Sequence, residues 1–124
     1  MCIRDRFPLV ADLDFKVSIA YGLVHEAVSD TAAVRAVFAI DPTGKIRAII
    51  YYPPQLGRSV DEIVRIFEAI QTTDKNGVSL GADWQPGDAV IVPSPATVAD
   101  AEKRTNGGGA GLDVKSWYLS KKTL

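Results

Sequence analysis

The sequence has very few of the side chains that bind soft metals or form disulfide frameworks. Its 124 residues include one cysteine, Cys2, and one histidine, His25. A lone thiol cannot form an internal disulfide, and one thiol with one imidazole is too small a ligand set for a tetrahedral zinc site. No residue pattern points to a carboxylate-bound metal, so we expect no metal ion.

The chain also lacks a strong excess of charge of either sign and any long apolar run. It contains 14 Lys and Arg residues against 15 Asp and Glu residues, and its sequence pI is near 5.7. Nucleic-acid binding requires a basic surface, which this balance does not supply. No apolar run approaches the roughly 20 residues that span a bilayer, and no signal-peptide core is present. We therefore expect a cytoplasmic protein without nucleic acid or a membrane as partner.

What is present is the pattern of one α/β domain with a modest core, since 47% of the residues are hydrophobic. Residues 7–14 predict a short apolar strand followed by a turn. Asp14 is placed to cap a helix that carries an apolar stripe over residues 17–21, and Gly22 predicts the end of that helix.

A β-hairpin follows a polar connection. The segments from Arg35 to Ile40 and from Ile46 to Tyr52 are apolar enough for two strands, and the sequence Asp-Pro-Thr-Gly at 41–44 separates them. Proline at the second position and glycine at the fourth position are typical of a type I turn.

A second helix begins after the two prolines that end the hairpin. Ser59 and Glu62 have the spacing of a capping box. An apolar face follows that can pack on the hairpin; it consists of Val60, Ile63, Val64, Phe67 and Ile70. The order strand, helix, hairpin, helix indicates an α/β layer arrangement.

Residues 74–124 differ in character and read as an arm. Three prolines between positions 86 and 95 forbid long regular elements, and Thr97 can cap one short helix. The glycine-rich residues 105–111 predict a linker, and residues 112–124 predict a final aromatic-bearing strand. We expect the arm to form no core of its own and to lie over another surface.

Six stretches together carry a resemblance to a known family: "FPLVAD", "AYGL", "VRAVFAIDPTGKIR", "YYP", "GRSVDEIVR" and "ADWQPGDAVIVPSP". In this order and spacing they resemble the C-terminal half of a peroxiredoxin of the one-cysteine type with an extended C-terminal arm. The resemblance implies a partial thioredoxin-like fold over residues 7–73 and a dimerisation arm over residues 74–124.

The same resemblance implies a function, namely thiol-dependent reduction of hydrogen peroxide and organic hydroperoxides. It implies no metal or organic cofactor, and homodimers or rings of dimers. Some related peroxiredoxins carry a resolving cysteine near the C-terminus, where this chain has Ser120 and no thiol. An external thiol reductant is therefore expected.

The chain departs from the family in its nucleophile. Family members carry the peroxidatic cysteine in a Pro-x-x-x-Thr-x-x-Cys motif, which this chain lacks. Its one thiol, Cys2, stands in "MCIRDR", which does not look like family sequence, and we interpret residues 1–6 as an artefactual head on a truncated chain. A thiol at a frayed terminus lacks the neighbours that lower a pKa. We expect this chain to be inactive alone.

Two arginines match arginines of the family. Arg35 falls on the active-site arginine, whose fixed donors favour the thiolate and stabilise charge on the peroxide oxygens. The alternative is a strand-end arginine whose stem packs while its head reaches water. Arg58 matches an arginine that pairs with an acidic residue near the catalytic cysteine. A surface charge at the helix start is an equally weighted alternative for Arg58.

A second function class stays open beside the enzyme. The hairpin edge and the apolar arm could serve a non-catalytic association module. His25 is expected near the rim of the active-site pocket, where a solvated or hydrogen-bonded histidine is the simpler interpretation.

Overall fold

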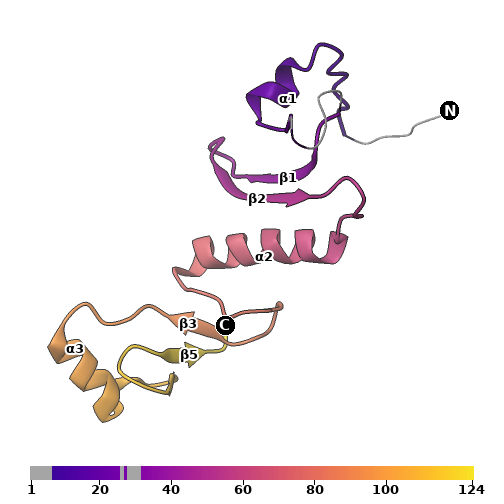
Figure 1. Ribbon diagram of the computed structural model, residues 1–124. Coiled ribbons are helices and arrows are strands. Elements are labelled where there is room, and N and C mark those ends of the chain that lie inside the picture. Colours follow the sequence, from indigo (N-terminus) through magenta and orange to yellow (C-terminus); the bar gives the residue numbers. More distant parts are fainter. Residues whose placement is uncertain (1–6, 26, 28–31) are drawn as a thin grey trace. The chain divides into compact units, whose positions relative to one another are not determined.

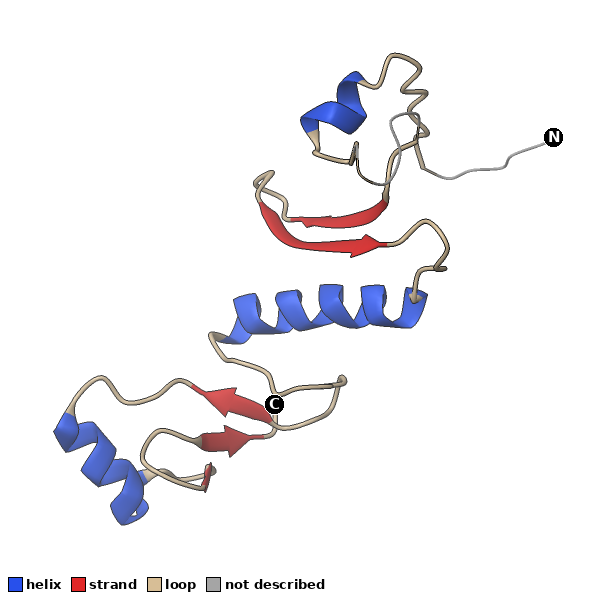
Figure 2. Cartoon of the chain, viewed as in Figure 1, coloured by secondary structure: helices blue, strands red, loops and turns tan. Residues whose placement is uncertain are grey.

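The computed structural model describes residues 7–25, 27 and 32–124, and the chain divides into two compact units (Figures 1 and 2). The first unit ends at Arg58 and the second begins at Ser59. Both contain helices and strands, as expected for an α/β chain. In the described residues, no helix combines the length and apolarity needed to cross a membrane.

The first unit is built on the predicted hairpin. Strands β1 (Arg35–Ile40) and β2 (Ile46–Tyr52) pair antiparallel, so both predicted strands are confirmed. The turn is fastened by Asp41, whose carbonyl oxygen accepts from the Gly44 N–H at 2.9 Å. The Asp41 carboxylate accepts from the N–H of Thr43 at 2.9 Å. Gly44 has a φ of 82°, a conformation that glycine adopts without steric cost.

Helix α1 (Lys16–Ala20) precedes the hairpin, and Gly22, the predicted stop, follows it with a φ of 64°. Asp14 is not the N-cap residue, but its carboxylate accepts from the first helical N–H, that of Lys16, at 3.4 Å. Phe15, with a φ of 57°, lies in the left-handed region directly before the helix. Asp12, three residues earlier, supplies the carboxylate that accepts from the first-turn N–H groups of Val17 and Ser18, at 3.0 and 2.7 Å.

The strand predicted within residues 7–14 was wrong, because these residues form an irregular segment, but the turn predicted after it is present at 13–14. A strand is stable only where a neighbour pairs its backbone groups. In the part of the chain that the structure describes, no strand pairs with this segment. Its apolar side chains are largely exposed, with Leu13 at 92%.

The second unit starts with helix α2 (Val60–Asn76). Ser59 caps it as predicted, since its side-chain oxygen accepts from the Glu62 N–H at 3.4 Å. The helix ends at Gly77, which adopts a left-handed conformation with a φ of 60° and donates its N–H to the Thr73 carbonyl at 2.9 Å.

The rest of the second unit is a small antiparallel sheet with one short helix. The elements are β3 (Val90–Val92), α3 (Val98–Lys103), the wide turn η1 (Arg104–Gly108), β4 (Asp113–Val114) and β5 (Ser120–Lys122), and the strand order is β3-β5-β4. Thr97 caps α3 as predicted, accepting from the Asp100 N–H at 3.1 Å. A final strand is present, as predicted, but it does not carry the aromatic residues. Trp117 and Tyr118 lie in the turn between β4 and β5.

The expectation that the arm forms no core was wrong. Val78, Trp84 and Val90 are buried together, and Ala69 of α2 packs against them. Prolines keep the strands short, yet one large indole supplies enough apolar surface to fill the centre. Its polar end is satisfied, because Trp84 Nε1 donates to the Asp88 carbonyl at 3.2 Å.

Candidate active site

Arg35 occupies the first position of β1, opposite Tyr52 at the last position of β2. Its side chain is exposed, as the strand-end interpretation expects, but its guanidinium is not free. Arg35 Nη1 donates to the carbonyl oxygen of Leu56 at 2.6 Å. A charge-assisted bond of this length holds the planar donor group in one orientation. Among the described residues, no ion pair or further hydrogen bond engages this guanidinium, which leaves its other N–H groups for an anionic ligand.

Arg58, the second candidate, lies two residues beyond that carbonyl. Two residues of chain span at most about 7 Å, so the bond from Arg35 to Leu56 also ties down the segment that carries Arg58. The Arg58 side chain is exposed, and among the described residues no ion pair engages it. The structure thus brings the two arginines into one neighbourhood at the end of the hairpin.

The opposite face of the hairpin carries a row of rings in edge-to-face and tilted contact. Tyr21 meets Phe38 at 5.2 Å between ring centroids, Phe38 meets Tyr51 at 6.3 Å, and Tyr51 meets His25 at 5.6 Å. Alternation along the strands directs Phe38 and Tyr51 away from the Arg35 face. This row packs the segment around α1 on the hairpin. The face that carries Arg35 is the more enclosed of the two, since Ala39 on it is 4% exposed, whereas Ile49 and Tyr51 on the opposite face are 45% and 46% exposed.

A surface pocket of about 620 Å³ lies at the end of this row. Its wall includes His25, Val34, Tyr51 and Tyr52, together with the backbone turn at 53–55. His25 therefore lines a pocket, and its Nε2 is 3.1 Å from the Gly22 carbonyl oxygen. Arg35 is not among the residues that line this pocket, so the expectation that His25 lies at the active-site rim stays a prediction. That contact and the tilted stacking on Tyr51 account for the histidine as a hydrogen-bonded wall residue.

Comparisons with known proteins agree on one family. Residues 69–108 match the model of the C-terminal domain of 1-Cys peroxiredoxin, and residues 3–49 match that of the AhpC/TSA family. A peroxiredoxin of Thermotoga maritima is 47% identical over 98% of this chain, and one of Aquifex aeolicus is 42% identical over 95%. The chain belongs to the peroxiredoxin family.

Solved peroxiredoxin structures confirm the fold. The yeast mitochondrial 1-Cys peroxiredoxin aligns with a TM-score of 0.69 and 35% identity, covering 89% of this chain and 53% of that one. Peroxiredoxin 6 of Arenicola marina aligns with a TM-score of 0.76 and 30% identity, covering 95% and 56%. These likenesses support the partial thioredoxin-like fold expected from the sequence.

The chain spans only about half the length of the curated peroxiredoxins it matches. It covers 57% of the Thermotoga maritima protein and 56% of the Aquifex aeolicus protein. Cys2 lies outside the described residues, so the structure does not place a thiol beside Arg35. Within those residues, no group of three His, Cys, Asp or Glu side chains could hold a metal ion.

The candidate site, as far as the structure describes it, consists of two exposed arginines, Arg35 and Arg58, at the end of the hairpin. The sequence pointed to Arg35 and Arg58 but missed the Leu56 carbonyl that orients the first of them. A backbone acceptor has no sequence signature of its own, because every residue carries one. The row of rings was also missed, although aromatic residues on adjacent strands at diagonal positions are a recognisable signal.

Proposed function

We propose that the intact protein reduces hydrogen peroxide and organic hydroperoxides with a cysteine thiolate, and that Arg35 assists this step. The thiolate attacks one peroxide oxygen, the O–O bond breaks, and water or an alcohol leaves once the second oxygen takes up a proton. The sulfur is oxidised to a sulfenic acid. As charge moves onto the leaving oxygen, fixed N–H donors stabilise it. The observation that carries the proposal is the guanidinium of Arg35, held at 2.6 Å on the Leu56 carbonyl.

Arg58 has a supporting role in this proposal. Its exposed head leaves it able to pair with a carboxylate near the thiol, which would orient that carboxylate and the donors around the sulfur. The competing role is a plain surface charge at the start of α2. A fusion enzyme that supplies an N-terminal part with a catalytic cysteine distinguishes the two roles by its rate of peroxide reduction.

The sulfenic acid must be reduced by a thiol from outside the chain. No cysteine occurs after Cys2, and Ser120 stands in the C-terminal stretch. For the yeast mitochondrial relative, the thiol is resolved via glutathione/thioredoxin systems. We infer an external thiol reductant of this kind, and we propose a cytoplasmic location, because thiols stay reduced there.

The proposed assembly is a homodimer or a ring of dimers, with residues 7–73 as part of the catalytic domain and residues 74–124 as the dimerisation arm. Exposed apolar side chains on α2, at Val60, Val64 and Phe67, support association. The same observation favours the second candidate function, a module that associates without chemistry.

The test compares two proteins. The 124-residue chain should consume no hydrogen peroxide with dithiothreitol beyond the rate of its Cys2→Ser variant, because Arg35 cannot replace a nucleophile. A large difference between those two rates would make Cys2 catalytic. A fusion of residues 7–124 to the N-terminal part of the Thermotoga maritima peroxiredoxin should act as a thiol peroxidase. A folded fusion that dimerises but leaves peroxide unconsumed would favour the association module.

A further inference from the structure

The carbonyl oxygen that holds Arg35 belongs to a tight turn directly after β2. The Leu56 N–H donates to the Pro53 carbonyl oxygen at 3.0 Å, which closes a four-residue turn. Pro54 and Gln55 occupy its two central positions. The Leu56 carbonyl in turn accepts from Arg35 Nη1 at 2.6 Å. The backbone of Leu56 is therefore held twice, through its N–H by the turn and through its carbonyl by the arginine.

Two consecutive prolines make this turn stiff. The ring of a proline fixes its own φ at about −65°. A proline also disfavours the α region for the residue before it, which restricts both Tyr52 and Pro53 to extended backbone. Three successive residues, from Tyr52 to Pro54, thus have little conformational freedom, and the chain leaves β2 in one direction.

The backbone angles of the turn fit type I. Proline at the second position of a turn has the φ that types I and II both require. Type II also requires a positive φ at the third position, and Gln55 is not among the described residues with a positive φ. Pro54 therefore stands where its ring preforms the turn that presents the Leu56 carbonyl.

An oriented guanidinium assists the proposed reaction more than a mobile one. An exposed arginine side chain has many rotamers, and holding it in one of them costs conformational entropy. Donors stabilise charge in a transition state best when they are oriented before the charge develops. In the part of the chain that the structure describes, the Leu56 carbonyl is the hydrogen-bond partner that holds Arg35. The stiffness of the turn therefore sets how firmly Arg35 is oriented.

We propose that Pro54 is a positioning residue for peroxide reduction, acting on Arg35 through the Leu56 carbonyl. This role rests on the proposed function and adds to it the element that orients the arginine. Pro54 contacts neither the peroxide nor the sulfur. Its ring fixes the turn, the turn fixes the carbonyl, and the carbonyl fixes the guanidinium. Loosening the turn should slow the reaction although Arg35 is still present.

The full 124-residue chain tests the first half of this proposal, because guanidinium order requires no nucleophile. NMR of isotope-labelled arginine measures how fast each guanidinium rotates about its Nε–Cζ bond, and a hydrogen bond at Nη slows that rotation. Arg35 should rotate more slowly than Arg58, which no ion pair among the described residues engages. Pro54→Gly should remove most of the difference. An unchanged rotation rate of Arg35 in Pro54→Gly would overturn the proposal.

The fusion of residues 7–124 to the N-terminal part of the Thermotoga maritima peroxiredoxin tests the second half. Pro54→Gly should slow thiolate oxidation by peroxide about tenfold, because the arginine loses its fixed orientation. Pro54→Ala should cost less, since alanine adopts the φ of the turn but is not locked there. The same NMR measurement on the fusion covers the case in which the 124-residue chain aggregates.

Pro42→Gly is the matched control. Pro42 has the second position of the turn at the other end of the same hairpin, which the bond from the Gly44 N–H to the Asp41 carbonyl closes. This change should leave the oxidation rate unmodified. Equal losses in Pro54→Gly and Pro42→Gly would assign the effect to a general loosening of the hairpin and would contradict the positioning role.

A double-mutant cycle with Arg35→Lys separates positioning from stability. If Pro54 acts through Arg35, Pro54→Gly should cost less than about twofold in the Arg35→Lys enzyme. A loss of about tenfold that persists there would overturn the positioning role. Circular dichroism checks that each variant is folded, and Pro54→Ala takes the place of Pro54→Gly if the glycine variant unfolds.

The same rates distinguish the two levels of the hypothesis. An Arg35→Lys enzyme that is slow beside a Pro54→Gly enzyme with the unmodified rate would refute the role of Pro54 alone. An Arg35→Lys enzyme with the unmodified rate would refute the proposed function of Arg35, and the role of Pro54 with it.

Discussion

The two units of this chain bury their apolar side chains to different extents. In the second unit Trp84 and Val90 are almost fully enclosed by short strands and by α2. In the first unit the enclosed apolar residues are the small Val34 and Ala39, while Leu13 and Ile19 lie in the open. A two-stranded hairpin has too little surface to cover both its own faces and a flanking segment. The better enclosed core therefore forms around Trp84 in the second unit, and not in the first unit, which has the longer strands.

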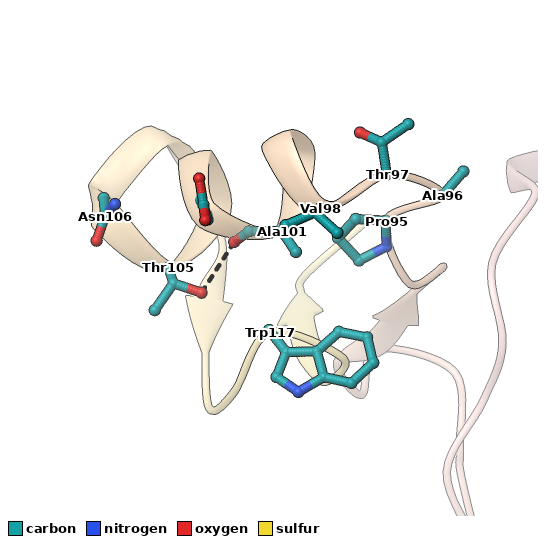
Figure 3. A pocket seen from close by; sticks show the side chains of 9 residues that line it. Pro95, Ala96, Thr97, Val98, Ala101, Thr105, Asn106 and Trp117 are labelled. Carbon is teal, nitrogen blue, oxygen red and sulfur yellow. Dashed lines mark hydrogen bonds between the residues drawn. The ribbon is translucent and has the colours of Figure 1, made fainter.

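The units also differ in the kind of side chains that they expose. The first unit holds Arg35 and Arg58, whose side chains are exposed. In the second unit the exposed side chains include the large apolar Val98 and Trp117 (Figure 3).

The largest expected effect is the loss of the second unit's core. Trp84→Ala should lower the free energy of unfolding by about 3 kcal/mol or more, because it removes a buried ring and leaves a cavity. The matched change Trp117→Ala, at an exposed site, should alter it by less than about 0.5 kcal/mol. Urea unfolding followed by circular dichroism measures both. Similar losses in the two variants would show that Trp84 does not define a core.

The next effect concerns the chemistry of the first unit in the rebuilt fusion enzyme. Arg35→Lys should slow thiolate oxidation by peroxide about 100-fold, since an ammonium group cannot reproduce a fixed guanidinium fork. Arg58→Lys should cost less. Stopped-flow fluorescence gives the rates, and the thiol pKa, measured separately, divides ionisation from transition-state effects. If the Arg35→Lys enzyme is folded and its thiolate is oxidised at the unmodified rate, Arg35 has no part in the reaction and is only a charged residue at the end of a strand.

Association of the chain is expected to be the third effect. Val64 and Phe67 are exposed on α2, and apolar surface of this kind promotes self-association. The 124-residue chain should associate or aggregate, and Val64→Lys with Phe67→Lys should reduce the associated fraction severalfold in sedimentation velocity experiments. A monomer that melts cooperatively at low concentration, before any substitution, would contradict this expectation.

The smallest effect is a pH dependence in the hairpin turn. The Thr43 hydroxyl and the Lys45 N–H donate to the Asp41 carboxylate, which lowers the pKa of Asp41 below its ordinary value of 3.8. The unfolded chain binds the proton more readily, so this stabilisation is complete above pH 3.8 and is lost as the pH falls through the lower folded value.

Asp41→Asn tests that sign. Its thermal midpoint should fall less between pH 7 and pH 3 than the midpoint of the unmodified chain, because the titrating group is gone. Glu62, whose pKa is lowered by its hydrogen bond with Arg65, lies in the second unit and provides the comparison. An identical pH response of Asp41→Asn and the unmodified chain would exclude the turn carboxylate as its source.

Local sequence patterns determined much of this molecule. The apolar segments at 35–40 and 46–52, with the turn sequence between them, predicted both strands, and Ser59 and Thr97 predicted the starts of α2 and α3. Each of these features depends on contacts between residues close together in the chain. The family resemblance located Arg35 for the same reason, since its segment is contiguous.

The tertiary structure decided what depends on partners distant in sequence. Residues 7–14 have the composition of a strand, but none of the described strands pairs with them. Asp12 joins Asp14 in accepting from the first-turn N–H groups of α1, with Phe15 in the left-handed region between them and the helix. The core around Trp84 and the bond from Arg35 to Leu56, 21 residues apart, required the chain to fold back on itself. A backbone carbonyl becomes a specific acceptor only when folding brings it next to a particular donor. For that reason no sequence pattern predicts which carbonyl will bind Arg35.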